Sequence, residues 1–201
     1  MEKLILVLLA AGDSRRFRGN KLLYEWQGKP MYRHIVDQIA SLPADCFMEK
    51  IVVTQYETVK ADLESRGYRA VENHESTRGI SHSIQLALQS FPDAQAAVCF
   101  AVCDQPYLKT ETLSQLICGW QNSKKGMGCL SYQGEPGNPA IFSKQYWEEL
   151  MNLKGDVGGK CIIRAHPDDL YSYEIEDAKE LEDVDVRDPS EFPTSTQYRI
   201  T

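Results

Sequence analysis

The sequence lacks several features that identify whole classes of protein. No apolar run approaches the roughly 20 residues that cross a membrane, and the first residues show no small-residue cleavage site of a secretory signal peptide. The net charge of −7 at pH 7 argues against a general binder of nucleic acid or of membrane surfaces. We therefore expect an ordinary soluble protein that binds neither nucleic acid nor membrane.

Cysteine is present but lacks the spacing that gives it a special role. The six cysteines are scattered without a CxxC pair, whereas disulfide frameworks and zinc sites usually show regular spacing. Cys99 and Cys103 lie in one apolar run, so we expect them in the core. Scattered thiols in a chain of this length favour a reducing compartment, so we expect a cytoplasmic protein.

Two familiar nucleotide-binding patterns are missing from the loop that follows the first apolar run. Leu4 to Leu9 are six consecutive apolar residues, and Gly12, Gly19 and Lys21 follow them. Lys21 precedes a leucine rather than Ser or Thr, which excludes a GxxxxGK[ST] P-loop, and the loop contains no GxGxxG pattern. No Ser/His/Asp or Cys/His nucleophile arrangement is evident, and the four histidines share no spacing.

The same loop has the composition of an anion site. The run from Leu4 to Leu9 predicts a strand buried on both faces, and ligands bind at the carboxyl ends of such strands in open α/β sheets. Small residues let backbone N–H groups approach an anion, while three arginines at 15–18 and Lys21 supply positive charge. We therefore predict that this loop binds the phosphates of a ligand.

Strand-like and helix-like segments alternate along nearly the whole chain. We expect strands at 4–9, 51–53, 68–72, 96–102, 126–132, 140–142 and 171–175, and helices at 31–42, 58–66, 84–91, 110–122, 143–150 and 161–165. This alternation predicts one α/β domain with a mainly parallel sheet. The polar loop before the helix at 84–91 suits an anion or a base edge, or Ser81 or Ser83 simply caps that helix; Ser143 is the expected cap of the helix at 143–150.

A carboxylate follows the strand expected at 96–102. Asp104 would lie at the same edge of the sheet as the glycine loop. A lone aspartate there can cap the next turn, but beside a phosphate loop a cation ligand is the better interpretation, because carboxylates and substrate phosphates together hold Mg²⁺. The acidic segment at 181–192 is typical of a solvent-exposed face. If this segment were a strand, Asp183 and Asp185 would lie on the same face of it.

A triphosphate loop facing a carboxylate-held Mg²⁺ suits nucleotidyl transfer. In that reaction an acceptor oxygen attacks the α-phosphorus and pyrophosphate leaves in line. The chemistry needs positioning and charge stabilisation more than a protein nucleophile. The absence of an evident nucleophile set is therefore consistent with this reaction.

Several motifs resemble those of one superfamily. Leu9-Ala10-Ala11-Gly12, followed by Ser14, Arg16 and Lys21, resembles the LAAGxSxRxGxxK signature of nucleotidyltransferases. Further resemblances follow in the family's order, at 78–83 (RGxSxS), 103–106 (DQP), 137–139 (GHP), 155–160 (GDxGAR) and 183–189 (DIDTPED). Within the superfamily the chain most resembles molybdenum cofactor cytidylyltransferases and related MobA-like proteins.

The resemblance implies a fold and an activity. The fold would be a single-domain, three-layer α/β/α Rossmann-like nucleotidyltransferase fold with a mostly parallel mixed sheet, with residues 1–110 as nucleotide-binding half and 111–201 as acceptor-binding half. The activity would be transfer of CMP from CTP to the phosphate of molybdopterin (molybdenum) cofactor, with Mg²⁺ as cofactor and a molybdenum hydroxylase as recipient. Ala11 favours CTP, because relatives with LAGG tend to use GTP.

The resemblance also assigns roles to residues. Nucleotide binding falls to Leu9, Ala10, Ala11, Gly12, Ser14, Arg16, Lys21, Arg78, Gly79, Ser81 and Ser83. Catalysis falls to Arg16, Lys21 and Asp104, metal binding to Asp104 and Asp185, and acceptor binding to Asn138, Asp156 and Lys160.

Three positions depart from the family pattern and keep other functions open. Arg18 stands where the family has glycine, Asn138 replaces the histidine of GHP, and Lys160 replaces an arginine and loses its bidentate geometry. The alternatives are another phosphorylated acceptor such as a sugar or polyol phosphate, a molybdopterin guanylyltransferase that uses GTP, and a non-catalytic nucleotide- or cofactor-binding module for hydroxylase maturation.

Overall fold

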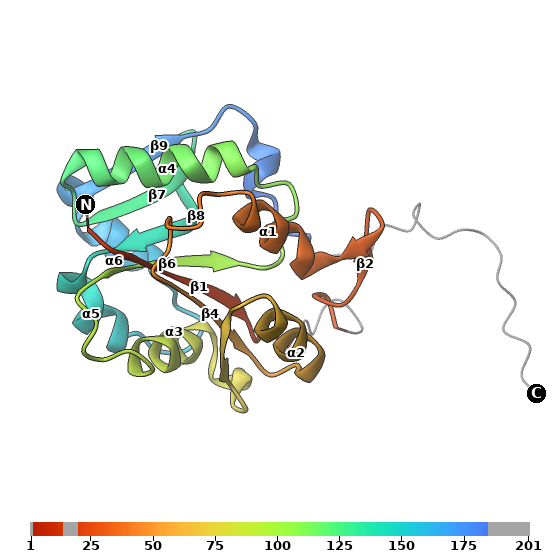
Figure 1. Ribbon diagram of the computed structural model, residues 1–201. Helices are drawn as coiled ribbons and strands as arrows, with labels where there is room; N and C mark the ends of the chain where they lie inside the picture. Colours follow the sequence, from red (N-terminus) through yellow and green to blue (C-terminus); the bar gives the residue numbers. More distant parts are fainter. Residues whose placement is uncertain (1, 14–19, 185–201) are drawn as a thin grey trace, which may run out of the picture.

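The apolar run near the amino end forms the central strand of the protein. The computed structural model describes residues 2–13 and 20–184, and in it β1 (Leu4–Ala10) lies within a seven-stranded sheet (Figure 1). The sheet order is β5-β4-β1-β6-β8-β7-β9. The other strands are β4 (Glu49–Thr54), β5 (Arg69–Glu72), β6 (Ala97–Val102), β7 (Met127–Tyr132), β8 (Glu135–Phe142) and β9 (Leu170–Glu174).

The sheet is mixed and mostly parallel, as the resemblance implied. Strand β1 pairs in parallel with both β4 and β6, and the β4–β5 and β7–β9 pairs are also parallel. Strand β8 runs antiparallel to its two neighbours, β6 and β7. The parallel strands β1, β4 and β6 therefore present their carboxyl ends at one edge.

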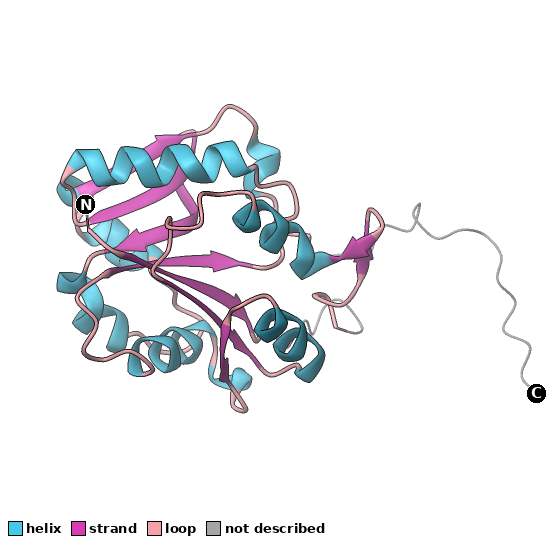
Figure 2. Cartoon of the chain, viewed as in Figure 1, coloured by secondary structure: helices cyan, strands magenta, loops and turns pink. Residues whose placement is uncertain are grey.

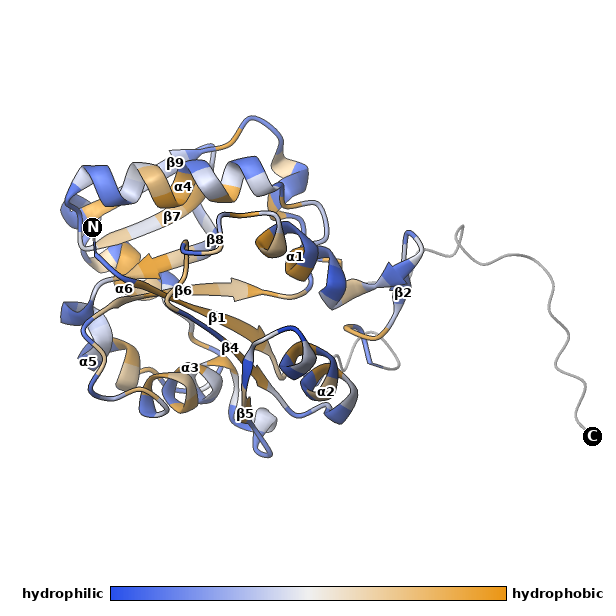
Figure 3. Ribbon diagram, in the orientation of Figure 1, coloured by the Kyte–Doolittle hydropathy of each residue, from blue (hydrophilic) through white to orange (hydrophobic). Residues whose placement is uncertain are grey.

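Helices cover both faces of the sheet, which makes three layers (Figure 2). The helices α1 (Met31–Ala40), α2 (Glu57–Ser65) and α4 (Thr110–Ser123) pack on one face, and α3 (Ile80–Gln89), α5 (Trp147–Met151) and α6 (Lys160–Ala165) on the other. Alternate residues of β1 divide between the faces, since Leu6 joins the first core cluster and Val7 the second. Figure 3 shows the apolar residues of the strands between the two helical layers.

Short elements complete the chain. The hairpin of β2 (Glu25–Trp26) and β3 (Lys29–Pro30) projects at the carboxyl end of the central strands (Figure 1). The 3-10 helices are η2 (Ser76–Arg78), η3 (Lys144–Tyr146), η4 (Pro167–Asp169) and η5 (Ala178–Leu181). In the part of the chain that the structure describes, no helix is long and apolar enough to span a membrane.

Several expected boundaries were wrong. The strand expected at 140–142 is longer, because β8 begins at Glu135 and includes a cis peptide bond between Asn138 and Pro139. Helix α3 begins at Ile80, so Ser81 and Ser83 lie inside its first turns and do not cap it. Ser143 precedes η3 and makes no side-chain cap bond.

The buried cysteines were predicted correctly. Cys99 and Cys103 are each at most 2% exposed, and burial raises the pKa of both thiols well above their ordinary value. All six cysteines are free. The burial of Cys99 and Cys103 fits a packing role rather than a chemical one.

Candidate functional site

The carboxyl ends of β1 and β6 bring two predicted residues into contact. Lys21 Nζ lies 2.8 Å from Asp104 Oδ2, and the two side chains are 9% and 28% exposed. The loop after β1 supplies the lysine, and the residue pair that follows β6 supplies the aspartate. The ammonium and the carboxylate are therefore held together at the edge where ligands bind in α/β sheets.

The second carboxylate oxygen of Asp104 is in an unusual environment. Oδ1 is buried and has no hydrogen-bond partner among the described residues. Buried polar atoms are normally satisfied, so an orphaned carboxylate oxygen needs an explanation such as a missing ion. An anionic oxygen of this kind is the ligand that a hard divalent cation prefers. No group of three or more His, Cys, Asp or Glu suited to a metal occurs within residues 2–13 and 20–184, so other oxygens would have to complete its coordination.

The acidic tail docks directly beside Asp104. The Val184 N–H donates to the Asp104 carbonyl at 3.0 Å. Gln105 Nε2 donates to the Leu181 carbonyl at 3.0 Å and to Asp183 Oδ1 at 2.9 Å. Residues 182–184 form no strand, so the strand that the family resemblance implied is not found there, and this segment instead hydrogen-bonds to the loop after β6. Asp185, predicted as a metal ligand, lies outside the described residues.

A small apolar cluster covers the docked tail. Trp26, Met31 and Val184 pack together, with Tyr24 and Tyr107 against them. The Trp26 and Tyr107 rings meet edge to face, with centroids 6.2 Å apart. The cluster ties the hairpin to the segment that approaches Asp104.

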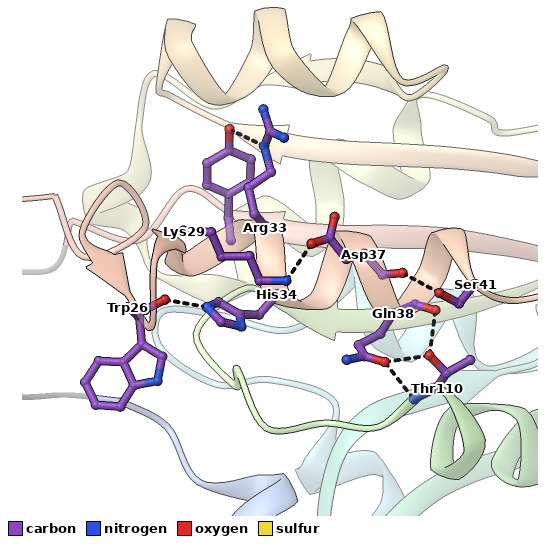
Figure 4. A network of polar contacts seen from close by, with 9 residues as sticks. Trp26, Lys29, Arg33, His34, Asp37, Gln38, Ser41 and Thr110 are labelled. Carbon is purple, nitrogen blue, oxygen red and sulfur yellow. Dashed lines mark hydrogen bonds and ion pairs between the residues drawn. The ribbon is translucent and has the colours of Figure 1, made fainter.

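The hairpin is itself fixed to α1 (Figure 4). His34 Nε2 lies 2.9 Å from the Trp26 carbonyl, and Lys29 Nζ donates to Asp37 Oδ2 at 2.5 Å. Burial lowers the pKa of His34, which favours the neutral ring at this position. Further along α1, the Gln38 side chain accepts hydrogen bonds from the Thr110 N–H and hydroxyl, joining α1 to the start of α4.

The loop after β1 is held by a set of side chains that sequence reasoning missed. The last residue of β4 and the two residues after it donate side-chain hydrogen bonds to three successive carbonyls. These bonds are Thr54 Oγ1 to Ala10 at 2.9 Å, Gln55 Nε2 to Ala11 at 2.7 Å, and Tyr56 OH to Gly12 at 2.7 Å. Asp13 Oδ1 accepts from Gln55 and from the Ser76 hydroxyl. The signal in the sequence was a run of three hydrogen-bond donors at the end of a buried strand.

The remaining residues predicted in this loop are placed only in part. Ala10 and Ala11 are buried, Leu9 is half-buried and Gly12 is exposed. Ser14 and Arg16 lie outside the described residues. Among the predicted phosphate ligands, the structure therefore describes the backbone of residues 9–12 and the Lys21 ammonium.

Gly79 permits a close approach between two loops. Its φ of +87° is a conformation that favours glycine, and an added Cβ would lie 2.3 Å from the Gly155 carbonyl carbon. The Ser81 N–H donates to the Gly155 carbonyl at 3.2 Å. The loop that carries Asp156 is thereby packed against the start of α3.

The two serines of the same segment have different surroundings from those expected. Ser81 and Ser83 are only 3% and 6% exposed. The Ser83 hydroxyl accepts a hydrogen bond from Asn73 Nδ2 at 2.9 Å, and Asn73 is fully buried. Arg78 is exposed, and its guanidinium pairs with Glu75 at 3.0 Å. Of the predicted nucleotide-binding side chains in this segment, Arg78 is the exposed one.

The residues predicted to bind the acceptor lie on three elements. Asn138 is half-buried in β8, Asp156 is exposed in the loop beside Gly79, and Lys160 is exposed at the first residue of α6. Burial raises the pKa of the Cys129 thiol on β7, and a hydrogen bond from Ser172 opposes that rise. No described hydrogen bond or ion pair joins these three side chains to one another.

A family model and several curated proteins match the sequence of this chain. The family model for the MobA-like NTP transferase domain matches residues 6–170. The bifunctional protein GlmU of Bifidobacterium adolescentis is 29% identical over 133 residues, covering 62% of this chain and 28% of GlmU. The chain thus spans about a quarter of the length of the curated relatives it matches.

Solved structures share the fold. A nucleotidyl transferase from Methanothermobacter thermautotroptrophicus superposes with a TM-score of 0.72 at 20% identity, covering 92% of each chain. Molybdopterin-guanine dinucleotide biosynthesis protein A from Archaeoglobus fulgidus superposes with a TM-score of 0.63 at 16% identity, covering 92% of this chain and 93% of that one. At these identities the likeness establishes the α/β fold alone.

Proposed function

Since the chain belongs to the family of MobA-like NTP transferase domains, we propose that it transfers CMP from CTP to the phosphate of molybdopterin cofactor. The observation that carries the proposal is the Lys21–Asp104 pair, 2.8 Å apart at the carboxyl ends of β1 and β6. A cation for phosphates and a carboxylate for a metal are the two parts that nucleotidyl transfer needs from a protein.

In the proposed reaction, an oxygen of the acceptor phosphate attacks the α-phosphorus of CTP. A new phosphorus–oxygen bond forms, the bond from the α-phosphorus to the β-phosphate bridging oxygen breaks, and pyrophosphate leaves. Negative charge grows on the leaving pyrophosphate, and the Lys21 ammonium beside Asp104 would stabilise that charge. Arg16 would add a second cation.

Asp104 fits the role of metal ligand. Its buried Oδ1 has no partner among the described residues, so it is the oxygen that would hold Mg²⁺. When bound there, Mg²⁺ supplies charge neutralisation to the triphosphate. Gln105 holds the Leu181–Val184 segment against this loop, and we propose that Asp185, the next residue, provides a second carboxylate.

Nucleotide and acceptor are assigned by resemblance. Ala11 favours CTP over GTP, and Leu9 to Gly12 would contact base and phosphates through their backbone. Gly79 and Arg78 would lie beside the base and ribose, while the buried hydroxyls of Ser81 and Ser83 would shape that pocket from behind. Asn138, Asp156 and Lys160 would bind the acceptor. Molybdopterin is proposed as the acceptor because one structural neighbour is a molybdopterin-guanine dinucleotide biosynthesis protein. The product would pass to a molybdenum hydroxylase.

The test is a matrix of nucleotides and acceptors. Purified protein is incubated with Mg²⁺, each of the four ribonucleoside triphosphates, and molybdenum cofactor or a sugar phosphate, and pyrophosphate is measured. We expect release with CTP that depends on molybdenum cofactor and stops when the metal is chelated. Pyrophosphate release with GTP alone would show that GTP, not CTP, is the nucleotide substrate. Release with a sugar phosphate alone would show that the acceptor is a sugar phosphate rather than molybdenum cofactor. Binding of CTP without turnover on any acceptor would contradict an enzymatic role.

A further inference from the structure

We propose that Thr54, Gln55 and Tyr56 form a brace that positions backbone N–H groups of the loop after β1 toward the triphosphate. The brace residues are positioning residues, because they hold the loop by its carbonyls rather than contact the ligand. The inference rests on the proposed function, since it explains how that same site would hold phosphates.

The brace begins where the sheet ends. The ladder between β1 and β6 stops at the Leu9–Val102 pair, and the ladder between β1 and β4 stops at Ala10–Thr54. Beyond these pairs the backbone of β1 has no neighbouring strand to satisfy its carbonyls. The Gln55 and Tyr56 side chains take over that task for the Ala11 and Gly12 carbonyls, each at 2.7 Å. Thr54 Oγ1 adds a hydrogen bond to the last paired carbonyl, that of Ala10, at 2.9 Å.

Three consecutive carbonyls therefore point the same way, toward the end of β4. In a regular strand they would alternate. Because a trans peptide is planar, its N–H points opposite to its C=O. We infer that the N–H groups of Ala11 and Gly12 face away from β4; the strand on the other side of β1 is β6, which Asp104 follows. Successive N–H groups on one side of a loop form a concave site for an anion.

Burial and further contacts make the brace rigid. Thr54 is 1% exposed, and its hydroxyl also accepts from the Tyr56 N–H at 3.1 Å. Gln55 Nε2 also donates to Asp13 Oδ1 at 2.9 Å, which holds the residue that follows Gly12. Burial, aided by the charge of Asp13, raises the pKa of Tyr56, so its hydroxyl remains a donor at neutral pH.

The ligand class follows from the groups presented. The loop offers backbone N–H donors, which contribute to phosphate affinity and carry no information about the base. Loss of the brace should therefore weaken binding of the triphosphate chain much more than binding of the nucleoside monophosphate. That difference separates a positioning role from general support of the fold.

The experiment compares CTP with CMP, each with Mg²⁺, by titration calorimetry. The variants are Tyr56→Phe, Gln55→Met and the double variant, which remove donors and keep side-chain size. We expect Kd for CTP to rise about 3- to 10-fold in each single variant and more than about tenfold in the double variant. Kd for CMP should change by less than about twofold, and the thermal unfolding midpoint should stay within a few degrees.

A matched control is available at the opposite end of the sheet. Tyr146→Phe removes a hydroxyl that donates to Asp169 Oδ2 at 2.6 Å, and it should leave both Kd values unchanged. Unchanged CTP binding in the double variant, or equal weakening of CTP and CMP, would overturn the brace while leaving the proposed function intact. If the wild-type protein binds no nucleoside triphosphate, the proposed function fails and the brace's role fails with it.

Discussion

The two sides of the candidate site are built differently. On the nucleotide side, at the carboxyl ends of β4, β1 and β6, polar groups from distant parts of the chain satisfy one another, as Lys21 does with Asp104. On the acceptor side, Asn138, Asp156 and Lys160 lie on separate elements and are half-buried or exposed. If these residues act as proposed, triphosphate recognition is built into the fold, whereas acceptor recognition depends on surface side chains that can change without cost to the core.

We expect the largest effect on activity from changes to Asp104. Asp104→Asn keeps the shape but removes the anionic oxygen proposed to hold the metal, and we expect kcat to fall at least about 10³-fold. Asp104→Ala should lose turnover nearly completely. Pyrophosphate release and circular dichroism on both variants check the result. Activity within tenfold of wild type, with the fold kept, would exclude the metal role.

A matched pair of lysine changes separates the two sides. Lys21→Met removes the ammonium beside Asp104 and should lower kcat/KM for CTP about 10²- to 10³-fold. Lys160→Met removes an exposed ammonium of the acceptor side and should raise KM for the acceptor with less than about a tenfold change in kcat. Steady-state kinetics with each substrate varied gives both numbers. Equal effects of the two changes on CTP kinetics would contradict the division.

A pair of glycine changes tests the contact between the sides. Gly79→Ala combines a strained φ with a Cβ 2.3 Å from Gly155, whereas Gly134 has a φ of +79° and no neighbouring atom within 4 Å of an added Cβ. We expect Gly134→Ala to cost about 1 kcal/mol of unfolding free energy. Gly79→Ala should cost about 2 to 4 kcal/mol and raise KM for CTP. Urea denaturation measures the loss of unfolding free energy in each variant. Equal losses would show that the loops of Gly79 and Gly155 move apart freely.

The smallest expected effect is a pH dependence of stability at the opposite end of the sheet, far from the candidate site. The Tyr146 hydroxyl and the Gly126 N–H hold the pKa of Asp169 below its ordinary value. A carboxylate with a lowered folded pKa stabilises the fold above its unfolded pKa, near 3.9, and loses that contribution as pH falls through the folded value. Asp169→Asn should therefore flatten the loss of thermal stability below about pH 4 and leave activity at pH 7 unchanged. An unaltered acid profile would show that Asp169 contributes nothing measurable.

Much of the fold could be predicted because it follows from local patterns. The six apolar residues from Leu4 to Leu9 required a strand buried on both faces, and alternation of strand and helix required a mainly parallel sheet. Lys21 and Asp104 could be placed at one edge because the carboxyl ends of parallel strands meet there. The prediction missed their direct pairing, since nothing in either segment specifies which partner each charge takes.

The rest depends on contacts between segments far apart in sequence. The brace from Thr54 to Tyr56 was missed because its partners are backbone carbonyls, which every residue possesses and no motif marks. Ser83 was expected at a helix end, but Asn73 in a different loop satisfies its hydroxyl inside α3. Polar and apolar residues alternate around Asp183 as in a strand, but Gln105 donates hydrogen bonds to the Leu181 carbonyl and the Asp183 carboxylate there.

The central claim is that the Lys21–Asp104 pair serves nucleotidyl transfer, and the position of a labelled phosphate tests it most directly. Wild-type protein and Asp104→Asn are incubated with α-³²P-labelled CTP, Mg²⁺ and molybdenum cofactor. We expect the label to move to the cofactor in the wild type, in step with pyrophosphate release, and to stay in CTP in the variant. Label that stays in CTP with the wild-type protein, or moves equally with both proteins, would contradict it.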